Sequence, residues 1–336
     1  MGSLDDILKQ ALAVQSRAHR SWLHTKPELE DGGLTMTVLG CGTMGTAVLG
    51  GILQSLQSHS EESAAASYTT TSTEPTPQRL PSKFHACVHS AHGAERVKAA
   101  LSKYNARLKI HEDGNLQAVQ DADIVLLACE TNVVARILEL EGMREALAGT
   151  LLISICAGLS ESSLCDNIYG RSPTPASPAD VKACRIVRAM PNAAAAIRES
   201  MTVIAIPNPP LDADRDALLT WIFTRIGRVV RLPADNMDAC TALCGSGTAF
   251  AAVVVEAMAA GAISMGIPRE QAYTMASQTV RGATGLMLRG EHPAVLRDKM
   301  STPGGCTTMG LSVLEEGGAR GTIAKAVRDT TIACGR

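Results

Sequence analysis

The stretch LTMTVLGCGTMGTAVLGGIL, residues 34–53, decides the fold of this chain. A β-rich run leads into the pattern Gly-x-Gly-x-x-Gly at residues 40–45, and an apolar helical run follows. Glycines at this spacing permit a tight turn, let the backbone approach a pyrophosphate, and allow the helix to pack closely on the strand. The helix N-terminus adds free N–H groups and a partial positive charge. Because the pattern stands between a strand and a helix, it predicts a dinucleotide-binding turn. The residues expected to contact the dinucleotide here are Gly40, Gly42, Thr43, Met44 and Gly45.

Outward from this turn, strand-like runs alternate with helical stretches as far as residue 207. The runs are TMTVLG, FHACVHS, ARLKI, ADIVLLAC, GTLLISI, CRIVRAM and MTVIAIP, and a last strand is expected at 228–232. Such alternation is typical of βαβ units in a parallel sheet that is covered on both faces. After 235 the strand signals stop and the sequence is helical. The predicted class is α/β: a Rossmann domain with a mostly parallel sheet at 34–232, then an all-α domain at 233–336.

Three segments are expected to lie outside the two cores. Residues 1–33 lack the apolar core of a secretory signal and form an N-terminal extension, either a short docking helix or a frayed end. Residues 58–82 are rich in Ser, Thr and Pro and predict a flexible surface insertion. Residues 170–180 have the same character and predict a surface loop.

Composition narrows the classes of partner. The chain has 336 residues, of which 46% are apolar and 19% charged, and its formal net charge is −2. That balance gives no field of the kind that attracts nucleic acid. The ten cysteines include no CxxC pair and no Cys/His pair at zinc spacing, so we expect no metal. They are interpreted mostly as buried thiols in a reducing compartment, the cytoplasm.

The segment 247–267 is nearly all apolar and could mimic a membrane span. It is mostly Ala and Gly, which drive insertion weakly, and it lacks flanking basic anchors. We therefore expect a buried helix and no membrane.

The end of the second strand bears on the identity of the dinucleotide. An NAD enzyme usually places an acid there to bind the ribose 2′-OH. This chain has His89 and Ser90 instead, with Arg96 close behind, and a guanidinium suits a 2′-phosphate. NADPH is favoured and NADH is the alternative; if neither is bound here, His89 and Arg96 are ordinary polar side chains on the surface.

Two Gly-rich segments stand out in the helical part, at 244–250 (CGSGTAF) and 301–308 (STPGGCTT). Each resembles a helix N-terminus with hydroxyls and free amides, which is the chemistry that binds a substrate carboxylate. Plain capping motifs would look the same. The candidate substrate residues are Ser246, Gly247, Thr302, Gly304, Gly305, Thr307 and Thr308.

Residues 34–336 resemble the pyrroline-5-carboxylate reductases. The resemblance is carried by VLGCGTMGTAVLGGIL, SICAGL, RIVRAMPN, DACTALCGSGTAF, AISMGIPREQA and, most specifically, LRDKMSTPGGCTTMGLSVLEEGGARG. It implies NADPH-dependent reduction of the C=N bond of a small cyclic imine acid, 1-pyrroline-5-carboxylate, to proline. It also implies that the helical domain is a dimerisation domain whose helices interleave with those of a second subunit, in a homodimer or a higher homo-oligomer.

The resemblance further implies where the site lies. The active site is expected between the nicotinamide and the STPGGCTT helix start, with Thr307 as the catalytic threonine that contacts the substrate. Asn115 falls where the family has an Asn that touches the cofactor. Four strand-end residues fall at positions where the family lies beside the cofactor: Cys129, Glu130, Ala157 and Gly158.

The sequence departs from the family pattern in three places. A Val-Lys-Pro turn beside the cofactor is replaced by Cys129-Glu130-Thr131, which exchanges a cation for an anion. The family's Ser-Gly-Ser-Gly-Pro-Ala-Tyr is CGSGTAF here, and the proline expected after Met-Pro-Asn is Ala194. These changes leave open a substituted pyrroline carboxylate, such as a methylated proline precursor in specialised metabolism, as the substrate.

The absence of a base supports imine reduction. An alcohol dehydrogenase moves an O–H proton through a His, Lys or Tyr, but neither Lys299 nor Lys325 lies on the CGSGTAF segment. His292 precedes Pro293 and is expected to cap a helix. Two rival classes remain: a non-catalytic NADP-binding regulatory protein, and a scaffold that binds no dinucleotide.

Overall fold

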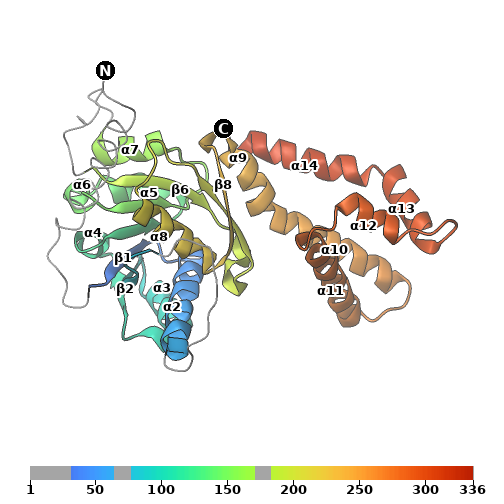
Figure 1. The fold of residues 1–336 in the computed structure, drawn as a ribbon, viewed down its shortest axis with the longest axis horizontal. Helices are drawn as coiled ribbons and strands as arrows, with labels where there is room; N and C mark the ends of the chain where they lie inside the picture. The colour runs from blue at the N-terminus through green and yellow to red at the C-terminus, as the bar shows by residue number, and fades with distance from the viewer. Residues whose placement is uncertain (1–31, 64–76, 171–182, 336) are drawn as a thin grey trace, which may run out of the picture. The chain divides into compact units, whose positions relative to one another are not determined.

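A computed structural model describes residues 32–63, 77–170 and 183–335 of the chain (Figure 1). By its internal contacts the chain divides after Met237 into two compact units. The first is the α/β unit and the second is helical, as the sequence predicts. The predictions for residues 1–31 and 171–182 fall outside the described residues.

One eight-stranded sheet forms the frame of the α/β unit, in the order β3-β2-β1-β4-β5-β6-β7-β8. Neighbouring strands pair in parallel, except that β6 and β7 are antiparallel. The predicted Rossmann fold with a mostly parallel sheet is confirmed, and each expected run contains a strand. The strands are β1 (Leu34–Leu39), β2 (Pro81–Val88), β3 (Leu108–Glu112), β4 (Ile124–Leu127), β5 (Leu151–Ser154), β6 (Arg185–Met190), β7 (Ser200–Ala205) and β8 (Gly227–Leu232).

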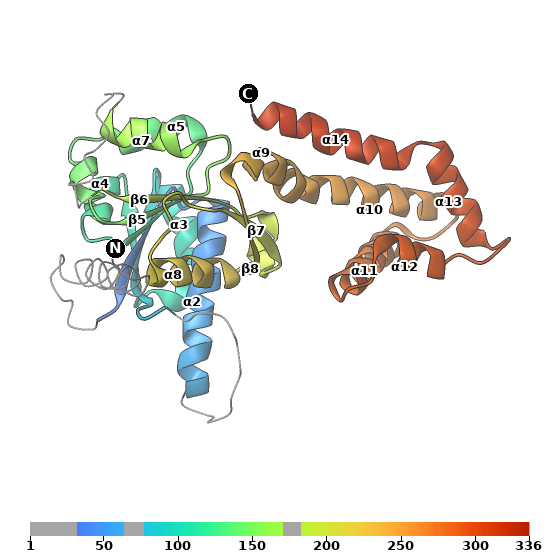
Figure 2. The same cartoon turned by 45° about the horizontal axis from the view of Figure 1, so that its top comes forward.

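Helices cover both faces of this sheet (Figure 2). One face carries α2 (Thr43–Ser63), α3 (Ala91–Ala100) and α8 (Ala213–Thr224), and the other carries α4 (Asn115–Gln120), α5 (Thr131–Leu138), α6 (Met143–Ala146) and α7 (Glu161–Tyr169). The alternation of side chains along β1 explains the two layers. Met36 and Val38 enter the core under α2, while Leu39 enters the core under α4 and α5. Between them, the Thr37 hydroxyl donates to Ala118 O of α4 at 2.6 Å.

The Ser/Thr/Pro-rich insertion is shorter than predicted. Helix α2 continues through Ser63, and β2 already begins at Pro81, so both ends of the expected 58–82 segment belong to regular elements. The run QSHSEES contains no Gly or Pro to stop the helix, and a proline is tolerated as the first residue of a strand. Residues 64–76 lie outside the described part of the chain.

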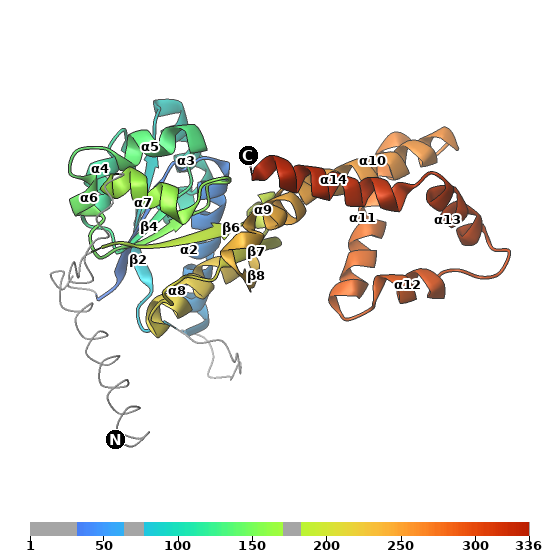
Figure 3. The same cartoon turned by 90° about the horizontal axis from the view of Figure 1, so that it is seen from above.

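The second unit contains helices and the turns that join them. Its elements are α9 (Met237–Cys240), a π-helical turn η4 (Thr241–Ser246), α10 (Gly247–Ser264), α11 (Arg269–Leu288), α12 (Pro293–Lys299), α13 (Cys306–Glu316) and α14 (Ala319–Cys334). α14 returns the chain to η4, as Figure 3 shows. The core that these helices share within one chain is small and consists of Ala259, Ala272 and Ala276 of α10 and α11. The unit therefore buries little of its own apolar surface.

The expectation that 247–267 is a buried helix is wrong for the single chain. A continuous helix from Ala234 to Ser264 is long and apolar enough to cross a membrane by length and composition, which alone is weak evidence, and only 11% of its apolar window is buried. Val253, Val254 and Met258 of α10 are exposed, since the small cluster that α10 shares with α11 does not cover them.

Candidate active site

The glycine turn after β1 has one role for each of its three glycines. Gly40 has φ +81°, and a Cβ on it would lie 2.5 Å from the Cβ of Cys129, so the turn and the close approach both require glycine. A Cβ on Gly45 would lie 2.9 Å from Cγ1 of Val38, which is the helix–strand packing expected of this position. Gly42 differs, because an added Cβ would meet only Gly40 O, at 4.0 Å. The turn is thus open at its middle glycine, which fits the approach of a pyrophosphate.

The loops that follow the parallel strands meet at one edge of the sheet. Cys41 N donates to Cys87 O at 2.8 Å, Ala128 N donates to Leu39 O at 2.8 Å, and Ile155 N donates to Leu127 O at 2.9 Å. Strand β1 lies between β2 and β4, so the chain reverses its direction of sheet growth at this point, where open α/β sheets bind dinucleotides. The predicted cofactor residues on these loops are His89, Ser90, Asn115, Cys129, Glu130, Ala157 and Gly158, and all lie at this carboxyl edge.

The structure shows the surroundings of the three side chains predicted to bind the cofactor at the end of β2. Ser90 caps α3 by accepting from Gly93 N at 3.2 Å. His89 Nδ1 lies 2.7 Å from a carboxylate oxygen of Asp113, and both side chains are exposed. Arg96 is exposed on α3 and lies close enough to the Cys41 thiol to interact with it electrostatically. These groups are available to a ribose, but His89 already has an acidic neighbour.

That neighbour, Asp113, is the residue that sequence reasoning missed. It follows β3 rather than β2, and its backbone has φ +50°, a conformation that Asp and Asn tolerate better than most residues. The available signal was Asp-Gly-Asn after a strand, which is typical of a tight turn. An acid therefore does stand near the end of the second strand, supplied by the loop after the third.

The departure Cys129-Glu130-Thr131 forms a braced corner between β4 and β5. Thr131 Oγ1 donates to Ala157 O at 3.0 Å, and Cys156 Sγ donates to Cys129 O at 3.2 Å. The hydrogen bond with Cys156 and burial raise the pKa of the Cys129 thiol, so it stays protonated. Glu130 is exposed at the N-terminus of α5. The corner replaces the rigidity of a proline with side-chain hydrogen bonds.

Helix α13 begins where the sequence predicts a helix N-terminus, and carboxylate binding there stays a prediction. The helix begins at Cys306 after Gly305, and Gly304 has φ +70°. The first helical hydrogen bond is donated by Met309 N to Gly305 O, so the preceding amides of the first turn have no helical acceptor. The Thr307 side chain is exposed at this turn. Its neighbour Thr308 is committed elsewhere, since its hydroxyl donates to Thr302 O at 2.9 Å.

The second predicted helix start, at 244–250, is not one. Ser246 and Gly247 lie inside the continuous helix 234–264, where η4 passes directly into α10. Their backbone amides lie within the helix, so this segment offers no helix N-terminus to a carboxylate. Glycine inside a helix costs only about 1 kcal/mol relative to alanine, and the π-helical turn absorbs it here. A contact to substrate from Ser246 stays a prediction that concerns its side chain.

The prediction for His292 is confirmed. It is the N-cap of α12, its Nδ1 accepts from Ala294 N at 3.3 Å, and Pro293 occupies the first helical position. This exposed histidine therefore caps the start of α12.

Comparison with known proteins decides the family. The model of pyrroline-5-carboxylate reductase dimerisation matches residues 234–334, and the model of NADP oxidoreductase, coenzyme F420-dependent, matches residues 35–158. A pyrroline-5-carboxylate reductase of Lophium arboricola is 54% identical over 299 residues, which cover 89% of this chain and 92% of that protein. This chain belongs to the pyrroline-5-carboxylate reductase family. A second relative of that name, from Neurospora crassa, is 47% identical over 89% of this chain and 91% of its own length.

Solved structures of the pyrroline-5-carboxylate reductase family share the fold. The Plasmodium falciparum enzyme, described with NADP bound, has a TM-score of 0.68 at 21% identity and covers 90% of this chain and 97% of its own. The Coxiella burnetii enzyme has a TM-score of 0.69 at 24% identity, with coverage of 90% and 97%. Because both identities are below 25%, these structures support the shared fold and nothing finer. The family resemblance seen in the sequence is confirmed.

Proposed function

We propose that this chain catalyses NADPH-dependent reduction of the C=N bond of 1-pyrroline-5-carboxylate to L-proline. The observation that carries the proposal is the identity of 54%, over most of both chains, to a protein named for that activity. The geometry supports the proposal with a candidate binding place for each reactant. An open glycine turn fits a dinucleotide, and the amides at the start of α13 suit a carboxylate.

The cofactor would lie on the carboxyl edge of the sheet. The pyrophosphate would approach the backbone at Gly42 and the N-terminus of α2, where free amides and the helix dipole favour negative charge. Arg96 and His89 are the side chains available to a 2′-phosphate, and Asp113 would help to hold His89 in place. When bound, NADPH supplies the hydride. NADH is the alternative, because Asp113 could instead accept from a free 2′-OH.

The substrate would bind at the first turn of α13. The amides of 306–308 would hold its carboxylate, and the exposed Thr307 hydroxyl would contact the ring nitrogen. Gly304 and Gly305 shape the turn, Thr302 braces it, and Ser246 is a further side-chain candidate. Transfer to an iminium carbon needs orientation more than a base, so positioning would supply most of the acceleration.

The exposed apolar residues of the helical unit support assembly. Val254 and Met258 lie on the same face of α10, four residues apart, and are 39% and 44% exposed. An exposed apolar surface of this extent marks an interface. We propose that copies of this chain associate through the C-terminal helices, as a homodimer or a higher homo-oligomer. We also place the enzyme in the cytoplasm, in keeping with ten free cysteines.

The test is NADPH oxidation measured side by side with 1-pyrroline-5-carboxylate and with a methylated analogue. We expect turnover of the unsubstituted ring. A strong preference for the analogue would favour the second candidate, a reductase of substituted pyrrolines, which the Cys129-Glu130-Thr131 corner supports as a departure from the family pattern. Turnover of neither ring, with NADPH still bound, would overturn the proposal in favour of a regulatory protein.

The role of Thr307 has its own test. Thr307→Ala removes the hydroxyl at an exposed position, so we expect kcat to fall about tenfold or more, in the range of a lost catalytic hydrogen bond, while the melting temperature stays unchanged. Thr307→Ser should keep most of the activity. Thr322→Ala, an equally simple change on the exposed part of α14, is the matched control. Wild-type kcat in Thr307→Ala would remove the assignment.

A further inference from the structure

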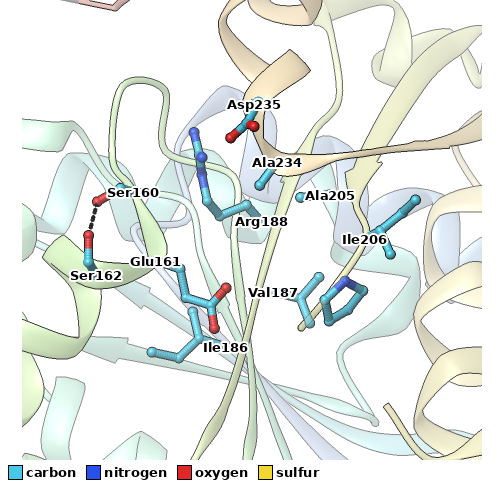
Figure 4. A pocket seen from close by; sticks show the side chains of 11 residues that line it. Ser160, Glu161, Ser162, Ile186, Val187, Arg188, Ala205, Ile206, Ala234 and Asp235 are labelled. Atoms are coloured by element: carbon cyan, nitrogen blue, oxygen red, sulfur yellow. Dashed lines mark hydrogen bonds between the residues drawn. The ribbon is translucent and has the colours of Figure 1, made fainter. Parts of the chain in front are cut away.

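A cavity lies in the α/β unit, formed by residues outside both the glycine turn and α13. Its volume is about 280 Å³. Strand β6, the end of β7, the first turn of α7 and η3 (Ala234–Asn236) surround it (Figure 4). None of the predicted cofactor or substrate residues lines it. It is therefore a feature that the proposed reaction does not use.

Three charged side chains line this cavity: Glu161 of α7, Arg188 of β6 and Asp235 of η3. Figure 4 shows the Arg188 side chain extended toward Asp235, with Glu161 nearer the sheet. Arg188 is half-buried and acts electrostatically on Glu161. Within the described ranges, neither a hydrogen bond nor a salt bridge joins any of these three charged groups to another residue. Since no hydrogen bond between described residues uses this half-buried guanidinium, it has donors to spare for a ligand.

The three charged side chains of the cavity limit the kinds of ligand that can bind there. A simple anion would meet Arg188 but also two carboxylates, and a simple cation would meet the carboxylates but also Arg188. Outside the lining, Arg185 also acts electrostatically on Glu161. Arg185 itself is occupied, since its Nη2 donates to Pro209 O at 2.5 Å. Burial raises the pKa of Glu161, which the two arginines oppose, so the cavity disfavours a further unpaired negative charge. A neutral molecule with both charges, a zwitterion, satisfies each group.

The rest of the lining is apolar. Ile186, Ala205, Ile206 and Pro207 supply carbon surface beside the charges. The serines at the rim are already engaged, because Ser160 Oγ accepts from Ser163 N at 3.0 Å in the cap of α7 and bonds Ser162 Oγ at 2.7 Å. These serines are therefore already used within the protein and do not select for the hydroxyls of a sugar. The small volume suits a ligand of a few carbon atoms.

From this geometry we propose that the cavity is a binding site for a free α-amino acid with a small apolar side chain. Arg188 binds the carboxylate through its two-pronged guanidinium. Glu161 and Asp235 bind the ammonium group, and the aliphatic side chain lies on Ile186, Ala205 and Ile206. The inference does not depend on the activity proposed above.

The test is isothermal titration calorimetry of the full chain with three probes: L-valine, N-acetyl-L-valine and isobutylamine. The second probe lacks the ammonium group and the third lacks the carboxylate. We expect heat of binding for L-valine at millimolar concentration and affinity at least tenfold weaker for the other two. No binding of L-valine, or equal binding of all three probes, would overturn the proposal.

Variants then locate the binding. Arg188→Met should weaken L-valine binding at least tenfold, while Arg136→Met, an exposed arginine of α5, should leave it unchanged. If Arg188→Met fails to fold by circular dichroism, Glu161→Gln serves instead and should weaken binding several-fold. Loss of L-valine binding in Thr307→Ala with retention in both cavity variants would place the ligand at α13 and refute the cavity site.

Discussion

The two units of this chain differ in how far they bury their large apolar side chains. The α/β unit buries its large aliphatic residues in two extensive cores on either side of the sheet. In the helical unit the buried cluster between α10 and α11 has three alanines, with residues such as Val255 and Tyr273 partly buried against them. Sixteen of the twenty exposed large apolar residues of the described chain belong to this unit. Burial of apolar area drives both folding and association, so a unit that leaves this much outside is built to be covered. The first unit covers most of its large apolar residues itself, and we infer that the second is covered by another copy of the chain, in keeping with its match to the dimerisation model.

The largest expected effect comes from a charge placed on the exposed helical surface. Val254→Glu puts a carboxylate on α10 at a position 39% exposed, where a covering subunit would have to desolvate it. We expect loss of the oligomer in sedimentation and at least a hundredfold loss of activity.

The matched control is Leu140→Glu in the α/β unit, where the side chain is 41% exposed. It should change neither mass nor activity. If the two variants behave alike, the contrast between the units is wrong.

A smaller and more local effect is expected from Gly42→Ala. The added Cβ meets no protein atom closer than 4.0 Å, so the unit should fold normally, but the methyl group stands where a pyrophosphate would approach. The dissociation constant for NADPH should rise at least tenfold in a fluorescence titration with the melting temperature unchanged.

Gly50→Ala on α2 is the control for the same chemical change, since its Cβ would meet Leu101 at an acceptable 3.4 Å. Wild-type NADPH affinity in Gly42→Ala would mean that the dinucleotide does not lie on this turn.

The smallest effect concerns alkaline stability of the α/β unit. Burial raises the pKa of Cys41 to about 11, of Cys87 to about 12 and of Cys184 to about 11, from an ordinary 9.0. The unfolded chain releases these protons near pH 9 and the folded chain holds them, so this stabilisation is complete below pH 9 and is lost as the pH rises toward 11 or 12. The melting temperature should fall modestly over that window.

A cysteine replacement tests the cause. Cys87→Ala should show a shallower fall of melting temperature above pH 9, although its stability at neutral pH will be lower because a buried side chain is shortened. Cys306→Ala, at an exposed position, should leave the pH profile unchanged. An unaltered profile in Cys87→Ala would show that other groups control the alkaline transition.

The same contrast explains what could be predicted from sequence. Every strand of the sheet could be predicted because its hydrophobic pattern is satisfied inside the chain, as Met36 and Val38 of β1 illustrate. The exposure of α10 could not, since an apolar helix has the same pattern whether its own chain or another covers it.

Within the site, local chemistry decided which predictions succeeded. The start of α13 follows from Thr302-Pro303-Gly304-Gly305, which stops one segment and opens the next. At 244–250 the same glycine signal failed, because η4 lets the helix continue through Gly245 and Gly247. Asp113 was missed because its approach to His89 depends on strand register and on a left-handed backbone, neither of which is visible in composition.

The central claim is that hydride passes from NADPH to the imine carbon of the ring acid. It is tested most directly with NADPH that carries deuterium at the transferable position of the nicotinamide, incubated with the enzyme and 1-pyrroline-5-carboxylate, and mass spectrometry of the product. We expect L-proline that carries one deuterium at C5. Proline without deuterium, or oxidation of NADPH without proline, would contradict it.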